Sequence, residues 1–412
     1  MATFEEIYKR LLKQQAGGED TAELDGSFDE LDCLLHPENH PVVWKFGICD
    51  CPPTRQEKCA DGCLFDAIKP NGADGIEIDS DMCVGCCACV DACDKQKLQA
   101  SKDIIPALKA VRTAEGPTYA LIAPAFAGQF GKDITEGMLR TAFKEVGFDG
   151  MIEVALFADI LTLKEGLEFD KNILSESDYQ LTSCCCPMWI AMIRRIYNEL
   201  MPHVPGAVSP MVACGRTIKA LYPNAVTVFV GPCVAKKAEA READIADAVD
   251  YVLTFQEARD MFEAMGIDPK KMTDSDKDHS SRAGRIYAQA GGVSEAVRAT
   301  VGRLNPDRKI TVRTQYADGV PACKAMIEEL RTKNTNANFF EGMGCVGGCV
   351  GGPKAVIGRE DGKECVAAYA ERATYKTPID NPYVIELLKR LGFDTVESLL
   401  KHSDIFTRDF EK

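Results

Sequence analysis

YQLTSCCCPMWIAMIRRIY occupies residues 179–197 and places a β-rich run, three consecutive cysteines and a helical pattern one after another. Two later stretches repeat this order, AVTVFVGPCVAKKAEA at residues 225–240 and NANFFEGMGCVGGCVGG at residues 336–352. Strands that alternate with helices predict an α/β fold. In such folds the loops at the carboxyl ends of the strands line one crevice. We therefore expect the three cysteine loops to converge.

The sequence around these loops predicts further elements. Pro187 suits the first position of a helix, and the cysteines just before it would lie at the positive end of that helix, which favours thiolate over thiol. Upstream, TYALIAPAF at residues 118–126 contains a buried strand over Tyr119 to Ile122. Phe4 to Leu12 has one apolar helical face, typical of a helix that docks on a larger body.

Composition limits the possible functions. The chain has 412 residues, 46% of them hydrophobic, so it can bury a full core in two or three domains. A net charge of -15 disfavours nucleic acid as a partner, because phosphate binding needs clustered Lys and Arg. The first residues, MATFEEIYKRLLKQQ, lack the apolar core of a signal peptide, and no later run is apolar enough to span a bilayer. We expect a cytoplasmic protein without membrane contact.

The 19 cysteines are unusual for a chain of this length. In a reducing compartment, tight runs of cysteine are better placed to share a metal than to form disulfides. Soft thiolate ligands point to iron-sulfur clusters or zinc.

Two cysteine runs lie in the segment that precedes the α/β region. The second run has the C-x2-C-x2-C-x3-C spacing that places three cysteines on one four-iron cube and sends the fourth to a neighbouring cube. The first run is less regular, C-x-C-x7-C-x3-C, but keeps the final C-x3-C. Exchange of the fourth cysteines predicts two 4Fe4S clusters, one held by Cys49, Cys51, Cys59 and Cys93 and the other by Cys83, Cys86, Cys89 and Cys63.

A zinc ribbon is the alternative for this segment, but zinc ribbons use two C-x2-C pairs and seldom a third cysteine at that spacing. His36 and His40 near Cys33 form an incomplete ligand set, so we do not expect a metal there. The isolated cysteines are expected to be structural, because buried unpaired cysteines are common. They are Cys33, Cys87, Cys214, Cys323 and Cys365.

In its three cysteine loops the sequence resembles the iron-only (FeFe) hydrogenases. Three signature loops of that family match TSCCCPMW (182–189), GPCVAKKAE (231–239) and EGMGCVGGCVGG (341–352). The triple cysteine and the GPC variant look like the B-type subgroup. The resemblance covers about residues 101–352. It implies a two-lobed α/β catalytic domain of sheets flanked by helices over residues 101–412. Before it we expect an N-terminal helix and linker (1–40) and a small ferredoxin-like α+β domain (41–100).

The resemblance also implies the cofactor, an H-cluster made of a 4Fe4S cube linked to a two-iron subsite with carbon monoxide, cyanide and a dithiolate amine. Cys349 would bridge the two parts. Lys236 matches a lysine that bonds an iron-bound cyanide; a surface helix lysine is the other reading, and Lys237 fits that description better. The remaining matches are Ala123, Pro124 and Ala125 in a loop that lines the other cyanide, Met343 beside the two-iron site, and the cube ligands Cys186, Cys233, Cys345 and Cys349.

Proton transfer needs titratable groups within hydrogen-bond reach of one another. Cys185 matches the relay cysteine of the family, and Glu165 and Glu168, three residues apart on one helical face, match its relay glutamates. The relay serine falls on Pro205, which has no hydroxyl, and the family's methionine before Pro-Cys is replaced by Gly231. Cys184 is either a second thiol donor or a space-filling neighbour of Cys185; we favour the latter, since adjacent cysteines seldom form an unstrained bridge.

The resemblance implies reversible interconversion of molecular hydrogen with two protons and two electrons. Electrons would pass through the two N-terminal clusters to a carrier such as ferredoxin, and hydrogenase maturation proteins would install the two-iron unit. Two alternatives remain, an iron-sulfur cluster assembly or scaffold protein of a related family and a hydrogen sensor with slow turnover.

Overall fold

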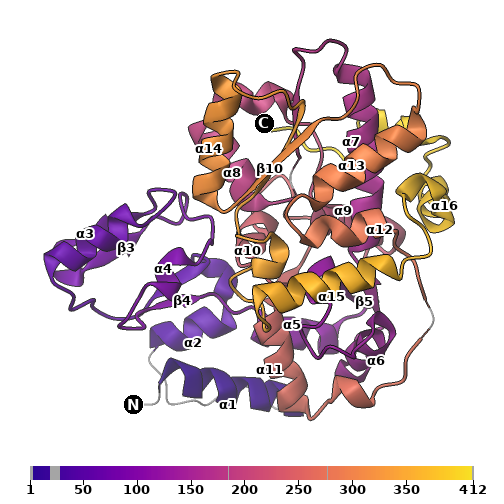
Figure 1. Ribbon diagram of the computed structural model, residues 1–412. Coiled ribbons are helices and arrows are strands. Elements are labelled where there is room, and N and C mark those ends of the chain that lie inside the picture. The colour runs from indigo at the N-terminus through magenta and orange to yellow at the C-terminus, as the bar shows by residue number, and fades with distance from the viewer. Residues whose placement is uncertain (1–2, 19–27, 184, 276, 411–412) are drawn as a thin grey trace.

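The fold is a mixed α/β structure built on two parallel sheets, seen in a computed structural model that describes residues 3–18, 28–183, 185–275 and 277–410 (Figure 1). The larger sheet has the strand order β6 (Gly150–Glu153), β5 (Thr118–Ile122), β8 (Val226–Gly231) and β9 (Tyr251–Thr254). The smaller has the order β10 (Thr314–Asp318), β11 (Phe339–Met343) and β7 (Gln180–Leu181). Every pair of neighbours in both sheets is parallel, which confirms the predicted α/β class.

The register of each sheet brings the cysteine loops to one edge. In the larger sheet Ile122 of β5 pairs with Val230 of β8, so the loops that begin at Ala123 and Gly231 leave side by side. In the smaller sheet Phe340 of β11 pairs with Leu181 of β7. Because the strands are parallel, the chain leaves each sheet at the carboxyl edge directly into the predicted loops.

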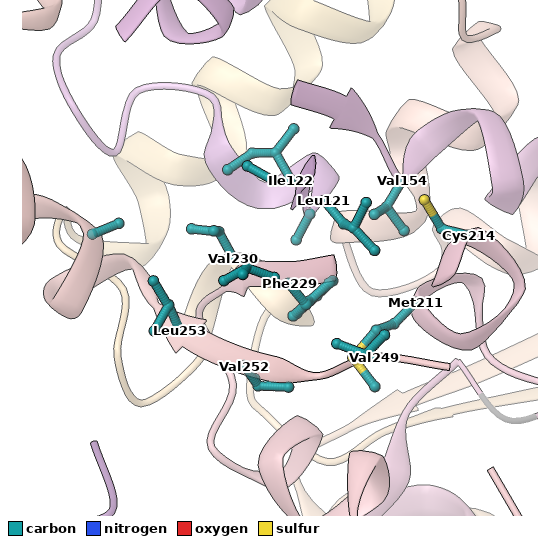
Figure 2. Packing of buried hydrophobic residues seen from close by; sticks show 14 of the residues in the cluster. Leu121, Ile122, Val154, Met211, Cys214, Phe229, Val230, Val249, Val252 and Leu253 are labelled. Carbon is teal, nitrogen blue, oxygen red and sulfur yellow. The ribbon is translucent and has the colours of Figure 1, made fainter. Parts of the chain in front are cut away.

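The core of the larger sheet is made of branched aliphatic and aromatic side chains (Figure 2). Leu121, Phe229 and Val252, one from each of three adjacent strands, are at most 3% exposed. Met211 and Cys214 of α9 (Pro210–Leu221) belong to the same buried cluster. Cys214 is completely buried, as expected for a structural cysteine.

Helices cover both sheets (Figure 1). No helix in the described ranges combines the length and the apolar character needed to cross a bilayer. Besides α9, the helices are α1 (Phe4–Gly17), α2 (Phe28–Leu35), α3 (Pro53–Asp61), α4 (Ala88–Asp91), α5 (Ile104–Thr113), α6 (Glu136–Val146), α7 (Ala155–Asn172), α8 (Pro187–Ile196), α10 (Ala235–Ala240), α11 (Phe255–Met265), α12 (Arg282–Arg285), α13 (Gly292–Leu304), α14 (Val320–Arg331), α15 (Arg359–Glu371) and α16 (Pro382–Arg390).

The cysteine-rich segment forms a small lobe that projects from the rest of the molecule, with α3 and β3 at its outer end (Figure 1). Two antiparallel pairs build it, β1 (Val43–Lys45) with β4 (Leu98–Ala100) and β2 (Ile68–Pro70) with β3 (Ile76–Ile78). The first pair joins the two ends of the segment and so closes the lobe on itself.

Helix α1 packs on α5 and α11 of the large body, and its Phe4 ring also contacts Trp44 and Phe46 of the small lobe. Its predicted apolar face is buried, and the Tyr8 hydroxyl donates to Asp260 Oδ2 of α11 at 3.0 Å. The Lys102 ammonium lies 3.9 Å from the centre of the Tyr8 ring. The prediction of a docking helix is therefore confirmed.

Candidate metal centres

The first and third cysteine loops are held together by close packing of α8 on β11. Pro187 takes the first position of α8, as the sequence predicts, and Cys186 occupies the N-cap position without a side-chain capping hydrogen bond. A Cβ on Gly342 would lie 1.9 Å from the indole of Trp189, so only glycine allows this approach. Consequently the Gly344 N–H reaches Cys186 Sγ, with a nitrogen to sulfur distance of 3.3 Å.

The second and third loops are also in contact. A Cβ on Gly352 would lie 2.9 Å from the carbonyl oxygen of Pro232 and 3.0 Å from that of Cys349. Beyond this contact, the Lys354 N–H donates to the Pro232 carbonyl at 3.0 Å. The residue before Cys233 is thus fixed against the residues that follow Cys349.

Four thiols from the three loops therefore lie in one buried region. They are close enough to interact electrostatically. Burial, reinforced by the neighbouring thiols, raises the pKa of Cys233 to about 11, that of Cys349 to about 12, and that of Cys345 well above its ordinary value. We call these four the central cysteine set: Cys186, Cys233, Cys345 and Cys349.

The sequence predicted that helix starts would lower the pKa of nearby cysteines and so favour thiolates. In the protein without bound metal, the pKa values of Cys233 and Cys185 are raised instead. The backbone N–H groups of Ala235 and Lys236 do face Cys233 and act to lower its pKa, but burial outweighs them. Burial and the Cys186 thiol likewise raise the pKa of Cys185. A bound metal reverses this balance because a coordinating thiol loses its proton. The donor set therefore fits a cationic group that accepts four thiolates.

No three His, Cys, Asp or Glu side chains in the described ranges are grouped tightly enough to hold one metal ion. Ligands of a single tetrahedral zinc lie only about 4 Å apart. A four-iron cube stands between its thiolates and separates them further.

Two adjacent lysines of α10 have different surroundings. Lys236 Nζ lies 2.6 Å from Glu239 Oε2, and its ammonium interacts with the thiols of Cys233 and Cys185. Its other two protons remain to bind an anion near those thiols. Lys237 was expected to be a surface lysine, and this is wrong: it is 1% exposed and lies 3.2 Å from carboxylate oxygens of both Asp103 and Glu257. Two carboxylates offset the cost of burying its charge.

The residues matched to the two-iron environment lie at strand ends next to the central set. Ala123 follows β5, and its Cβ would be 3.3 Å from a Cβ placed on Gly231, which ends β8. Pro124 and Ala125 open a short 3-10 helix directly after it. Met343, 2% exposed, ends β11 one residue before the Gly344 that contacts Cys186.

Cys185 lies next to a buried carboxyl group that the sequence pointed to. Both the hydroxyl and the backbone N–H of Ser183 donate to the Glu165 carboxylate, the latter at 2.8 Å to Oε1. Burial raises the pKa of Glu165 to about 7. Ser183 belongs to the TSCCCPMW motif, but its hydrogen bonds to Glu165, which lies on a different element, were not predictable from the motif.

The two predicted relay glutamates share one buried face of α7 but are not hydrogen-bonded to each other in the structure. Glu165 Oε2 and Glu168 Oε2 are both buried without a hydrogen-bond partner. Glu168 Oε1 is held by Lys164 Nζ at 2.5 Å. Pro205 lies in the loop before α9 and offers only its carbonyl, which accepts from Ala207.

Two further buried titratable groups surround this site. Glu341 of β11 accepts from the backbone N–H groups of Gly291 and Ser294 at the start of α13, and burial raises its pKa to about 7. Tyr287 interacts with Glu165 and Cys185, and its hydroxyl oxygen lies 2.8 Å from that of Thr162. Glu341 belongs to the quoted EGMGC motif, whereas nothing in the sequence signalled Tyr287.

The small lobe brings its cysteines together in two groups. The outer set lines a cavity of about 270 Å³. The inner set is linked by electrostatic interactions of Cys63 with Cys83, Cys86 and Cys89. We call Cys49, Cys51, Cys59 and Cys93 the outer set, and Cys63, Cys83, Cys86 and Cys89 the inner set; Cys87 lines the pocket of the inner set as well.

The inner set adjoins the central set. A Cβ on Gly85, which has φ +71°, would lie 3.1 Å from Ala235 Cα, two residues beyond Cys233. The thiols of Cys86 and Cys345 interact electrostatically. Members of the outer and inner sets pack around the same apolar cluster of the lobe, and the inner set adjoins the central set, so the three sets follow one another from the lobe to the interior.

The remaining candidates have packing roles or lie outside the described residues. Cys33 and Cys323 are buried, and Cys87 packs against Val42 and Val234. His40 Nε2 is 2.7 Å from Asp32 Oδ2, and Cys365 is half-buried. Cys184 lies outside the part of the chain that the structure describes.

Comparison with known proteins identifies the class. The family described as iron only hydrogenase large subunit, C-terminal domain, matches residues 116–353, which is more than half of the chain. The protein therefore belongs to the iron-only hydrogenase family, as the three cysteine loops indicated.

Individual relatives agree with this class. Iron hydrogenase 1 of Clostridium pasteurianum is 28% identical over 285 residues, 59% of this chain and 50% of that protein. The NADP-reducing hydrogenase subunit HndD of Solidesulfovibrio fructosivorans is 26% identical over 367 residues, 75% of this chain and 63% of that protein. The chain thus spans between half and two thirds of the length of these relatives.

Solved structures share the fold. Two variants of the FeFe hydrogenase HydA1 of Chlamydomonas reinhardtii superpose with TM-scores of 0.60 and 0.61 at 20% identity. Each alignment covers 72% of this chain and 97% of the algal chain.

Proposed function

We propose that this protein is an FeFe hydrogenase that interconverts molecular hydrogen with two protons and two electrons. The observation that carries the proposal is the convergence of the central cysteine set from three separate loops, beside Lys236 and Cys185. These four thiols would hold the 4Fe4S cube of an H-cluster, with Cys349 bridging to the two-iron subsite. When bound, that subsite supplies the metal at which hydrogen is split or formed.

The residues around the subsite would bind and orient it. Lys236 would donate to a cyanide, since its ammonium keeps donors free of Glu239. The backbone of Ala123, Pro124 and Ala125 would line the other cyanide. Met343 would pack against the subsite and exclude water.

Protons would leave through side chains of this chain. Cys185 would exchange a proton with the subsite and with Glu165, which Ser183 holds in place. Glu168 would be the next group, and a water bound by the unpartnered oxygens of the two glutamates would take the place of the hydroxyl that Pro205 does not supply.

Electrons would pass from one cysteine set to the next, each N-terminal set holding a 4Fe4S cluster, to a ferredoxin-type carrier. We also propose the domain plan of an N-terminal helix and linker (1–40), a ferredoxin-like domain (41–100) and a catalytic domain (101–412). We place the protein in the cytoplasm and in the B-type subgroup, and we expect maturation proteins to install the two-iron unit.

The decisive experiment is infrared spectroscopy of protein matured with a synthetic or enzymatically built two-iron unit, combined with dye-linked hydrogen uptake. We expect bands of iron-bound cyanide and carbon monoxide together with hydrogen-dependent dye reduction. Protein that takes up the cubes but gives no such bands would refute the proposal.

An assembly or scaffold role is the second candidate. The cytosolic Fe-S cluster assembly factor NAR1 of Kluyveromyces lactis is 30% identical over 107 residues, 26% of this chain. Under this role the purified protein would pass its clusters to an apo acceptor and consume no hydrogen. Cys185, Lys236 and the two glutamates favour the enzyme.

A further inference from the structure

The outer cysteine set lies at an accessible end of the molecule. Helix α3, which carries Cys59, is at the outer end of the projecting lobe (Figure 1). Cys51 is only partly buried, and the neighbouring Ile48 is 62% exposed, an unusual position for a large apolar side chain. A cluster bound here would be within reach of a partner at the surface.

The rim of this cavity is basic although the protein is acidic. Among the side chains that line it, four are cationic and one is anionic, Asp94, in a chain of net charge -15. Asp94 forms an ion pair with only one of the four, Arg55. The cationic side chains are Lys45, Arg55, Lys95 and Lys97.

Three of these cations keep most of their charge available. Lys45 Nζ donates to a backbone carbonyl, that of Asp74, at 2.9 Å, which leaves its charge uncancelled. Lys95 approaches Asp50 only to 3.9 Å, and both side chains are more than half exposed. Lys97 is half-buried at the cavity wall. An exposed ion pair such as Lys95 with Asp50 has a small interaction energy and cancels little of the lysine charge. The electrostatic potential at the rim of the cavity therefore remains positive.

Apolar groups lie beside the basic rim. Ile48 and Pro52 are exposed in the loop that carries Cys49 and Cys51, and Pro53 is exposed at the start of α3. An apolar patch next to charged side chains is the common composition of a protein interface, and electrostatic complementarity sets the rate and specificity of association.

We propose that this face is the docking site of an acidic protein that carries one electron at a time. The inference rests on the proposed function. Oxidation of one hydrogen molecule to two protons releases two electrons, so two carrier molecules would dock in turn, each reduced by one electron from the cluster of the outer set. The lysines supply local positive charge, opposite in sign to an acidic carrier, on a protein whose net charge is -15.

A competing explanation is that the lysines only offset the charge of the bound cluster. Under that explanation their removal would change the reduction potential of the cluster and leave carrier binding unaltered.

The test uses the matured full-length protein, a purified acidic ferredoxin as probe, and the variants Lys45→Gln and Lys97→Gln. Lys58→Gln is the control, since this lysine is exposed on α3 but does not line the cavity.

Ferredoxin binding is measured by calorimetry, and ferredoxin-dependent hydrogen oxidation by its rate, both from low to moderate salt concentration. We expect each cavity variant to raise both the Kd and the KM for ferredoxin about threefold to tenfold at low salt, with a smaller difference at high salt. Turnover with the small cation methyl viologen should stay within twofold of the unsubstituted protein.

Unchanged ferredoxin affinity in both cavity variants would overturn the docking site, as would an equal loss in Lys58→Gln. A shift in the midpoint potential of the outer cluster without a change in Kd would assign the lysines to the cluster instead. Failure of the unsubstituted protein to reduce methyl viologen would refute the hydrogenase proposal, whereas the Kd comparison would still decide the docking site.

Discussion

Gly85 of the small lobe lies against Ala235 of the large body, so close that a Cβ on the glycine would be 3.1 Å from the alanine Cα. This contact joins the inner cysteine set to the loop of Cys233. The positive φ of Gly85, +71°, is also one that other residues rarely adopt. The glycine therefore sets the distance over which an electron would move between two clusters.

Replacing Gly85 by Ala should push the lobe away from α10 and slow electron transfer between the inner cluster and the cube. We expect a several-fold lower rate of cube reduction by a prereduced lobe in freeze-quench EPR. Gly72→Ala is the control, because Gly72 also has a positive φ, +49°, but a Cβ there meets nothing within 4 Å. Equal rates in the two variants would show that the contact does not control transfer.

The exchange of fourth cysteines can be tested by comparing spectra. Cys93→Ala should remove the cluster of the outer set, so its EPR spectrum should match that of Cys59→Ala. Cys33→Ala is the control, since Cys33 is buried, lines neither cavity of the lobe and should leave both clusters in place. A Cys93→Ala spectrum that matches Cys89→Ala instead would reverse the assignment.

Replacing Lys237 by Met should destabilise the protein by about 3 kcal/mol, because it removes the nearest cation of two buried carboxylates and leaves only Arg241, 3.6 Å from Asp103, and the interaction of Lys102 with Glu257. Both Asp103 and Glu257 are within 3.2 Å of the ammonium. The urea midpoint of cluster-free protein measures the effect. Adding Asp103→Asn and Glu257→Gln to the variant should restore part of the stability, and no restoration would contradict the electrostatic cause.

The α/β class and the three loops were predictable because they follow local rules. Strand patterns that run into cysteines mark the carboxyl edges of parallel sheets, and a proline after Cys186 marks a helix start. Both features depend on residues adjacent in sequence, and both occur in the structure.

The surroundings of single side chains were not predictable in the same way. Lys236 and Lys237 are neighbours with the same propensities, yet the partners that bury Lys237 come from residues 103 and 257. Tyr287 approaches Glu165 from a segment more than a hundred residues later. Sequence spacing carries no information on such contacts, which arise only when distant elements pack.

Cys185→Ala should abolish most turnover but retain the infrared bands of the two-iron unit, because Cys185 would move protons without holding the metal. Turnover is measured as dye-linked hydrogen oxidation. Cys323→Ala is the matched control, a buried thiol that donates to backbone carbonyls and belongs to none of the cysteine sets. Activity retained in Cys185→Ala would remove this thiol from the proton path.

Glu165→Gln should change both activity and the pH dependence of stability. Burial raises the pKa of Glu165 to about 7 in the folded protein, against an ordinary value of 4.5. Between pH 4.5 and pH 7 the folded state therefore binds the Glu165 proton more tightly than the unfolded state does. Because of this difference, the free energy of unfolding falls as pH rises, and the contribution of the bound proton is lost above about pH 7. Glutamine does not ionise, so the variant should gain stability relative to the unsubstituted protein from pH 5 to pH 8, by at most roughly 3 kcal/mol. The measurement is the difference in urea midpoint between the two proteins at each pH, with Glu364→Gln on the exposed face of α15 as control. If the difference in urea midpoint did not vary with pH, Glu165 would be ionised throughout this range. It could then not hold a proton near neutral pH.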